Sequence, residues 1–419
     1  MSVECKDLPA IGGEHGISSV YPTLADVISF KEGTLRVTRG YPRFVMHPYL
    51  DALARITVPD NDFRVVISSA QGGRFLRDEF FSDLDVEIVE REGFAVITVQ
   101  DAEQYGRLFE DARNAGFTLS SRKAKRILCH VPDPEDGSVD DCASMIAGFE
   151  RGASAERTFM FSSGMGALFA ALYATFNDAK PEVIIVGNPY VDTIQLFTKF
   201  LVRRGLNPPR VVNDVDGFET ACGPRTGIVY CEVPTNPLLR VADIERMTRV
   251  AHANSTAVLV DSTIATPYNV SPFVFGADLV MHSTTKFLNG LNDHLGGVLM
   301  VNPSSGLVSP ERVAGFISMT GSGLDPEEGK ILLSHMYGFE KRMNTINRNA
   351  LLIARYLSSL PVVEKVYYPF LEDHVDYETA RRYFRHGASG VVSFYLSGSS
   401  RERAARFYDN CSIPGKGPT

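Results

Sequence analysis

Lys286 is the side chain of this sequence best suited to covalent chemistry, because it follows an apolar run and lies among hydroxyl groups. It comes after residues 279–281 in the segment HSTTKFLNG, with Ser283 and Thr285 just before it. We expect this lysine to be partly enclosed, and burial lowers the pKa of a lysine amine and makes it a nucleophile toward an aldehyde. The neighbouring hydroxyls can bind phosphate oxygens. The alternative is an ordinary surface lysine.

Asp261 ends a second apolar run, residues 257–260. A carboxylate at the end of a buried strand needs a partner, because an unpaired buried charge is costly. A protonated pyridine nitrogen is one suitable partner. A helix cap or a structural salt bridge is the alternative.

Ser163, Gly164 and Met165 form a small turn that leads into an apolar stretch, 165–176, which we expect to be a helix. Such a turn exposes backbone N–H groups at the positive end of the helix, where a phosphate can bind. A plain junction between loop and helix is the alternative. The glycines here also begin a dinucleotide-binding pattern, but Phe169 stands where that pattern needs its last glycine.

Asn236 lies in the segment EVPTNP, between two prolines that stiffen the turn. A rigid turn can present the asparagine amide to a ligand, although an ordinary turn explains the same residues.

The elements that position these four segments follow from the hydrophobic pattern. Continuous apolar runs at 183–186, 227–230, 257–260 and 279–281 predict strands buried on both faces, and helical stretches such as 190–204 and 242–254 lie between them. This alternation predicts an α/β fold with a mostly parallel sheet flanked by helices. Ligands bind such sheets at the carboxyl ends of the strands, where the four segments fall.

The remaining sequence divides into three further regions. Residues 1–56 contain frequent proline and glycine and are expected to form an extended arm. Strands at 63–67 and 94–99 and a helix from Asp101 to Ala115 predict a small α/β unit over 57–155, with 131–141 as a surface loop. The α/β domain spans 156–309. Helices around 328–360 and a strand at 390–396 predict a smaller α+β domain over 310–419.

Composition excludes several classes of protein. The 42 basic and 50 acidic residues give a net charge of -8, which argues against nucleic-acid binding. We see no membrane-spanning run and no signal pattern at the N-terminus. The six cysteines are scattered without metal-ligand spacing, so we expect free thiols, no metal site and a cytoplasmic location.

Taken together, the segments SSGM, PTNPLLRVADI, VDSTIATPYN and GADLVMHSTTKFLNG resemble the Cys/Met-metabolism family of pyridoxal-phosphate enzymes. That family contains cystathionine γ-synthases, γ- and β-lyases and homocysteine synthases. The resemblance implies a PLP-dependent transferase fold of the aspartate-aminotransferase-like kind, with residues 156–309 as the PLP-binding domain. The long arm and the apparent insertion at 57–155 look most like fungal cystathionine γ-synthase-like proteins.

The resemblance also implies a role for each site residue. Lys286 would hold pyridoxal 5′-phosphate covalently, and Asp261 would pair with its ring nitrogen. The phosphate would be held by the segment around Ser163, Gly164 and Met165 and by the hydroxyls of Ser283 and Thr285. Tyr190 would stack on the cofactor ring, and Asn236 would bond the ring hydroxyl. Tyr41 and Arg43 would bind the phosphate in the site of a neighbouring subunit.

Two departures from the family pattern bear on function. Ser262 stands where the family commonly has asparagine. Family members also carry an arginine for the substrate α-carboxylate in a segment beyond Thr419. We expect Arg401, Arg403 and Arg406 to lie on a helix and none of them to hold that carboxylate.

The resemblance leaves three functions open. The first is replacement at Cγ of an O-acyl-L-homoserine by a thiol or a carbon nucleophile, with Lys286 as the base that moves protons between Cα and Cβ. The second is γ- or β-elimination from cystathionine or a related amino acid. The third is a non-catalytic binding protein. The expected partners are a small amino acid, a nucleophilic co-substrate and further copies of the chain in a homodimer or homotetramer with shared sites.

Overall fold

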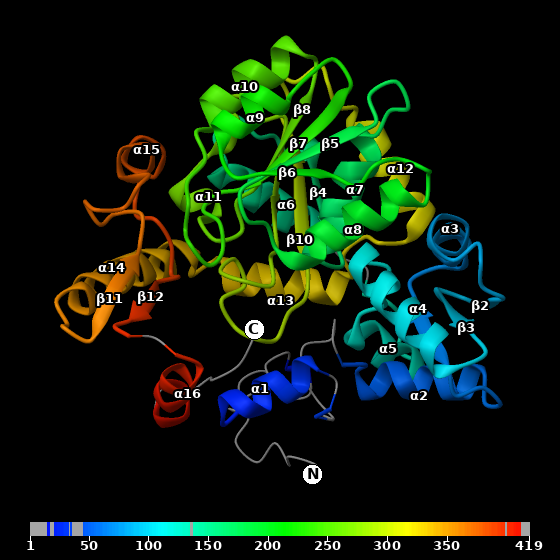
Figure 1. Cartoon of the computed structure of the whole chain (residues 1–419). Helices are drawn as coiled ribbons and strands as arrows, with labels where there is room; N and C mark the ends of the chain where they lie inside the picture. Colours follow the sequence, from blue (N-terminus) through cyan, green and yellow to red (C-terminus); the bar gives the residue numbers. More distant parts are fainter. Residues whose placement is uncertain are drawn as a thin grey trace.

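The computed structural model describes residues 15–16, 21–32, 34–35, 45–134, 137–398 and 400–411. A seven-stranded sheet lies at its centre, in the order β4-β10-β9-β8-β7-β5-β6 (Figure 1). Six strands run in one direction and β10 runs against both of its neighbours. The strands are β4 (Thr158–Phe161), β5 (Glu182–Val186), β6 (Arg210–Val212), β7 (Thr226–Glu232), β8 (Ala257–Asp261), β9 (Leu279–His282) and β10 (Gly297–Val301).

Helices cover both faces of this sheet, because its strands are apolar on both sides. In β8, Val258 and Val260 face one hydrophobic core, and Ala257 and Leu259 face the other. The first core is closed by α6 (Ser138–Phe149), α9 (Val215–Ala221), α10 (Ile244–Ala253) and α13 (Pro326–Met336), and the second by α7 (Gly164–Thr175), α8 (Val191–Val202) and α12 (Pro310–Thr320). The predicted α/β class and the four predicted strands are confirmed.

A second, three-stranded antiparallel sheet precedes the central one in the chain, in the order β1-β3-β2. Its strands are β1 (Arg64–Ile67), β2 (Glu87–Arg91) and β3 (Phe94–Thr98), and its helices are α2 (Pro48–Thr57), α3 (Ala70–Phe80), α4 (Ala102–Ala115) and α5 (Ser121–Leu128). Phe75 and Phe117 of this part pack against Phe169 and Phe316 of the central part. The two sheets therefore share one hydrophobic core.

Helices lie at three places where the sequence predicted a loop, an arm or a domain boundary. Helix α2 begins at Pro48, inside the predicted extended arm 1–56, at a position where helices tolerate proline. The acidic segment 131–141 is not all loop: α6 starts at Ser138, and Asp140 and Asp141 suit the positive end of a helix. Finally, α12 and α13 follow residue 309 but pack on the central sheet.

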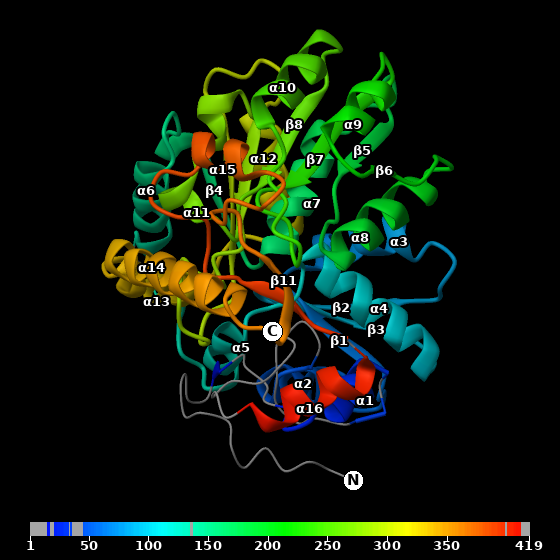
Figure 2. The same ribbon diagram turned by 60° about the vertical axis from the view of Figure 1, so that its left-hand side comes forward.

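The C-terminal part contains a two-stranded antiparallel sheet and three helices. These are α14 (Phe339–Ser358), β11 (Val363–Tyr367), α15 (Tyr377–Tyr383), β12 (Ser393–Leu396) and α16 (Arg401–Asn410). Helix α16 packs beside α1 (Leu24–Lys31), as Figures 1 and 2 both show. The Tyr408 hydroxyl donates to the Tyr21 carbonyl at 3.0 Å and the Leu24 N–H donates to Asp409 at 2.8 Å. The two ends of the described chain are thereby joined.

Short helical turns complete the fold: α11 (Thr266–Asn269) and the 3₁₀ turns η2 (Ala155–Arg157) and η3 (Pro272–Phe275). None of the described helices combines the length and the apolar character needed to cross a membrane.

Candidate active site

The four segments singled out in the sequence meet at one edge of the central sheet. Strands β7, β8 and β9 are parallel, so Glu232, Asp261 and His282 end at the same edge. Strand β4 ends there too, because Gly297 of β10 pairs with Phe161 while its neighbour Val298 pairs with His282. The four segments therefore lie at the carboxyl ends of strands, as the sequence predicted.

The turn before α7 lies directly against the lysine segment. A side chain at Gly164 would place its Cβ 2.9 Å from the Ser283 Cβ, so only glycine allows this approach. Ser163 caps the helix, with its Oγ accepting the Gly166 N–H at 3.1 Å, and the Met165 side chain is buried. The first N–H groups of a helix lack helical partners. The beginning of α7 therefore offers backbone donors beside Ser283.

Asp261 is tied to the same segment by hydrogen bonds. Its Oδ1 accepts the Thr263 N–H at 2.9 Å, and the Thr263 Oγ1 accepts the Ser283 N–H at 2.8 Å. Burial raises the pKa of the Asp261 carboxyl, while the hydrogen bonds from Thr263 act in the opposite direction. Asp261 and the lysine turn thus hold fixed positions relative to each other.

Glu232 is a site residue that the sequence analysis did not identify. It pairs with Asp261 across β7 and β8, and the Tyr230 hydroxyl lies 3.2 Å from Glu232 Oε1 and 3.3 Å from Asp261 Oδ2. Oε1 also accepts the Tyr190 N–H at 2.5 Å. Burial and the charge of Asp261 raise the pKa of Glu232. The signal was available, because Glu232 follows an apolar run as Asp261 does.

Lys286 lies on a tight turn after β9. The Lys286 N–H donates to the Ser283 carbonyl at 3.2 Å, and the Gly290 N–H donates to the Lys286 carbonyl at 2.8 Å. The Thr285 hydroxyl braces the turn by donating to the Gly296 carbonyl and accepting the Gly296 N–H. The Lys286 residue itself is exposed. The expectation of a partly enclosed lysine is therefore wrong for the single chain.

Asn236 lies on the exposed turn that follows β7. Hydrogen bonds between Thr235 and Arg240 close this turn, with the Thr235 N–H donating to the Arg240 carbonyl at 2.9 Å. The turn is at the same sheet edge as Asp261, because β7 and β8 end together.

Tyr41 and Arg43 are outside the described residues. Arg401, Arg403 and Arg406 lie on α16, beside α1, so the predicted helix is confirmed. Their relation to a substrate carboxylate stays a prediction.

The site residues fit pyridoxal phosphate in two respects. Gly164 leaves room for close approach at the start of α7, where backbone donors suit a phosphate. The hydrogen bonds that the described residues give to Asp261 come from the neutral groups of Thr263 and Tyr230. Asp261 is partly buried. A carboxylate in such a place with neutral partners is stabilised by a nearby cation, and a protonated ring nitrogen supplies one.

Comparison with known proteins gives consistent results. The sequence model of the Cys/Met metabolism PLP-dependent enzymes matches residues 141–415. An L-methionine gamma-lyase of Fusobacterium nucleatum subsp. polymorphum is 33% identical over 293 residues, which cover 70% of this chain and 72% of the relative. An O-succinylhomoserine sulfhydrylase of Pseudomonas aeruginosa is 33% identical over 305 residues, which cover 72% of each chain.

A solved structure resembles the fold as well. The cystathionine gamma-lyase from Lactobacillus plantarum, complexed with L-serine, aligns with a TM-score of 0.56 and 31% sequence identity. The alignment covers 62% of this chain and 66% of that one. The family match begins at residue 141, so β1 to β3 and α2 to α5 lie outside it.

Proposed function

Because this chain belongs to the Cys/Met metabolism family of pyridoxal-phosphate-dependent enzymes, we propose that it replaces the acyloxy group of an O-acyl-L-homoserine at Cγ. The incoming group is a thiol, such as that of cysteine, or a carbon nucleophile. The observation that carries the proposal is the junction of three parts at one sheet edge: the start of α7, the Asp261 carboxylate and the Lys286 turn.

Each residue has a task in this reaction. When bound, pyridoxal phosphate withdraws electrons from the α-carbon of an amino acid, so that protons on the neighbouring carbons become acidic. The Lys286 amine removes the proton at Cα and moves protons at Cβ. Asp261 stabilises positive charge at the ring nitrogen. Glu232 fixes the backbone of Tyr190, whose ring would stack on the cofactor.

The other predicted contacts hold the cofactor in place. Gly164, Met165 and the hydroxyls of Ser283 and Thr285 would bind its phosphate, and Asn236 would bind its ring hydroxyl. Tyr41 and Arg43 would reach the phosphate from a neighbouring copy, which makes the active protein a homodimer or a pair of homodimers.

A second candidate is elimination without replacement. It is favoured by the names of two relatives, which are gamma-lyases. The same side chains serve both reactions until the leaving group has departed from Cγ.

A product survey distinguishes these reactions. Purified holoenzyme is incubated with O-acetyl- or O-succinyl-L-homoserine, with and without cysteine, other thiols or carbon acids, and the products are measured by mass spectrometry. We expect a γ-substituted amino acid and free acetate or succinate. Accumulation of 2-oxobutanoate and ammonia in the presence of nucleophile would instead identify a lyase.

The Lys286→Ala variant is the control for this survey. Losing a positioned acid–base group lowers turnover by roughly 100- to 10,000-fold, and borohydride should no longer fix the cofactor to the chain. Unchanged turnover in this variant would contradict the assigned role. Bound cofactor without any product in the wild-type protein would favour the non-catalytic alternative.

A further inference from the structure

We propose that Arg122, on α5, is a positioning residue for the lysine turn and acts on it through Glu328, His294 and Thr284. The inference rests on the proposed role of Lys286. It concerns a part of the chain, before residue 141, that the family match does not include. It gives the three-stranded unit a task in cofactor binding.

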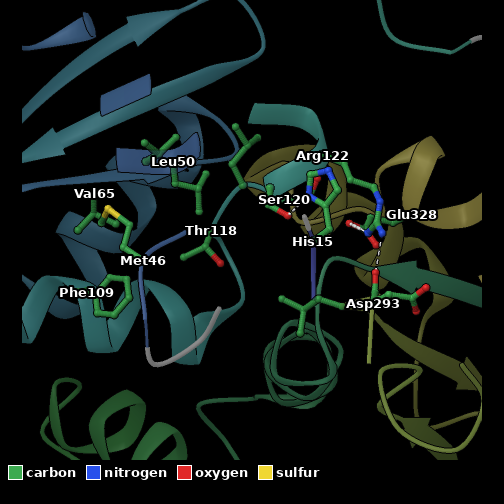
Figure 3. A pocket seen from close by; sticks show the side chains of 14 residues that line it. His15, Met46, Leu50, Val65, Phe109, Thr118, Ser120, Arg122, Asp293 and Glu328 are labelled. Atoms are coloured by element: carbon green, nitrogen blue, oxygen red, sulfur yellow. Dashed lines mark hydrogen bonds and ion pairs between the residues drawn. The ribbon is translucent and has the colours of Figure 1, made fainter. Parts of the chain in front are cut away.

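Four buried side chains form a continuous chain of polar contacts. Arg122 Nη1 lies 2.8 Å from Glu328 Oε1, as Figure 3 shows. Glu328 Oε2 lies 3.0 Å from His294 Nδ1, and His294 Nε2 lies 2.9 Å from Thr284 Oγ1. The four residues are 6%, 3%, 0% and 0% exposed. Thr284 stands between the two hydroxyl residues, Ser283 and Thr285, that precede Lys286.

The charge of Glu328 fixes the direction of its hydrogen bond with His294. Burial alone would raise the pKa of Glu328, but the hydrogen bond with His294 and the charges of His294 and Arg122 outweigh it, so this pKa lies below its ordinary value. An ionised carboxylate only accepts, and His294 Nδ1 therefore donates to it. The second ring nitrogen is left for the Thr284 hydroxyl.

Arg122 also holds the backbone next to His294. Its Nη2 donates to the Asp293 carbonyl at 2.6 Å, a contact that Figure 3 also shows. The same region is closely packed, because a Cβ on Gly296 would lie 2.5 Å from Thr284 Oγ1 and 2.6 Å from His294 Nε2. Glycine at position 296 therefore leaves the space in which His294 and Thr284 meet.

Removing Arg122 leaves the Glu328 carboxylate buried without its cation. Breaking one side of a buried ion pair is strongly destabilising, so Glu328 and then His294 would shift. Thr284 would lose its hydrogen bond, and the turn that carries Lys286 would lose a fixed point. The Asn289 N–H, which donates to the Thr284 carbonyl at 3.0 Å, and the bonds between Thr285 and Gly296 would still hold the rest of the turn.

The cavity beside this cluster does not explain it as a ligand site. It is lined by Arg122, Glu328, Asp293 and Ser120, and its volume is about 20 Å³. That volume holds about one water molecule.

Arg126 provides a matched control. It lies one turn further along α5, is equally buried, and makes ion pairs to the same helix α13, at 2.6 Å to both Asp325 and Glu327. Its side-chain partners within the described residues are Asp133, Asp325 and Glu327, and none of them bonds to Thr284. Arg122→Met and Arg126→Met therefore remove similar buried cations, but only the first interrupts the path to the lysine turn.

The experiment measures cofactor binding without substrate, so that its outcome does not depend on which reaction the enzyme catalyses. We expect Arg122→Met to weaken pyridoxal-phosphate binding about tenfold and to shift the pH at which the visible absorbance of the bound cofactor changes. Arg126→Met should leave both quantities within about twofold of wild type, although thermal unfolding shifts in both variants. Equal effects of the two variants on binding and absorbance would overturn the proposal.

A second pair of variants covers the case in which Arg122→Met does not fold. Thr284→Val removes the hydroxyl and keeps the shape, and Thr284→Ser keeps the hydroxyl. Only the valine variant should reproduce the binding loss and the altered pH dependence. Wild-type behaviour of Thr284→Val would contradict the proposal. Borohydride labelling of Lys286 tests the proposed site separately: labelling elsewhere would refute the site itself.

Discussion

Glu232 and Asp261 end neighbouring parallel strands at paired positions, so two carboxylates meet beside one tyrosine hydroxyl. A single hydroxyl donates one proton and cannot satisfy two anions. Burial raises the pKa of both groups, and the charge of Asp261 raises that of Glu232 further. The pair is therefore most stable with one proton, which Glu232 carries when Asp261 faces a cation.

The free energy of unfolding should accordingly decrease as the pH rises, and Glu232 should cause part of that decrease. Below the ordinary glutamate pKa of about 4.3, folded and unfolded states bind this proton equally. As the pH rises toward the raised pKa of the folded state, the unfolded state loses the proton first. Each pH unit between the two pKa values then costs up to about 1.4 kcal/mol of folding free energy.

Glu232→Gln removes this dependence and keeps an oxygen that accepts the Tyr190 N–H. Melting temperatures of the apoprotein between about pH 5 and pH 9 should fall less steeply in this variant than in wild type. Glu182→Gln, at an exposed ion pair with Arg225, is the control and should follow wild type. Parallel curves for Glu232→Gln and wild type would show that Glu232 is ionised throughout.

At the level of elements, the sequence predicted four strands of the central sheet and missed two others that are also largely buried, β4 and β10. Strands β5, β7, β8 and β9 are central and apolar on both faces, so each has an unmistakable run. Strands β2 and β6 were not predicted, because both lie at sheet edges and are largely exposed. Their structure depends on a neighbouring strand that no local pattern reveals.

The same distinction holds for the site. Lys286, Asp261 and the turn before α7 could be identified from residue types and order. The bridge through Tyr230 and the path from Arg122 could not, because they join residues far apart in the chain. The bridge through Tyr230 depends on the order of the strands, and the path from Arg122 depends on the packing of α5 on α13.

The contact between α7 and the lysine turn makes a prediction about Gly164. Gly164→Val puts a branched side chain where the Ser283 Cβ lies 2.9 Å from an added Cβ, so the two elements must separate. Pyridoxal-phosphate binding, followed by absorbance, should weaken about tenfold or more, because overpacking costs roughly 1–3 kcal/mol. Gly148→Ala on α6 is the control, because nothing lies within 4 Å of its added Cβ. Replacing a helical glycine by alanine stabilises the fold by about 0.5–1 kcal/mol, so cofactor binding should not weaken. Equal cofactor binding by both variants would mean that the contact is not needed.

For the whole molecule, the exposure of Lys286 in a single chain favours a site completed by a second copy. If Arg43 reaches across such an interface, Arg43→Ala should weaken cofactor binding about 10- to 100-fold, since hydrogen bonds to charged groups contribute about 1.5–3 kcal/mol. Arg91→Ala, which removes an exposed arginine, is the control and should leave cofactor binding unchanged.

Mixing subunits tests the sharing directly. A hybrid of Lys286→Ala and Arg43→Ala chains contains one site with an intact lysine from one chain and an intact arginine from the other. At a cofactor concentration too low to load the Arg43→Ala variant, re-associated mixtures should recover activity that neither variant has alone, with dimers detected by sedimentation. No recovery in verified hybrids would place Arg43 and Lys286 of the same chain together.

The position of β4 in the sheet also determines when the site can form during synthesis. β4 leaves the ribosome before β5 to β9, yet its strand partner in the described sheet is β10, which is made after them all. The nascent chain can assemble the parallel strands in order while the segment that carries Ser163 and Gly164 waits without a partner. Unpaired strands in partly made chains are prone to aggregate. The sheet edge that carries the four site segments can therefore be complete only after β10 has been made.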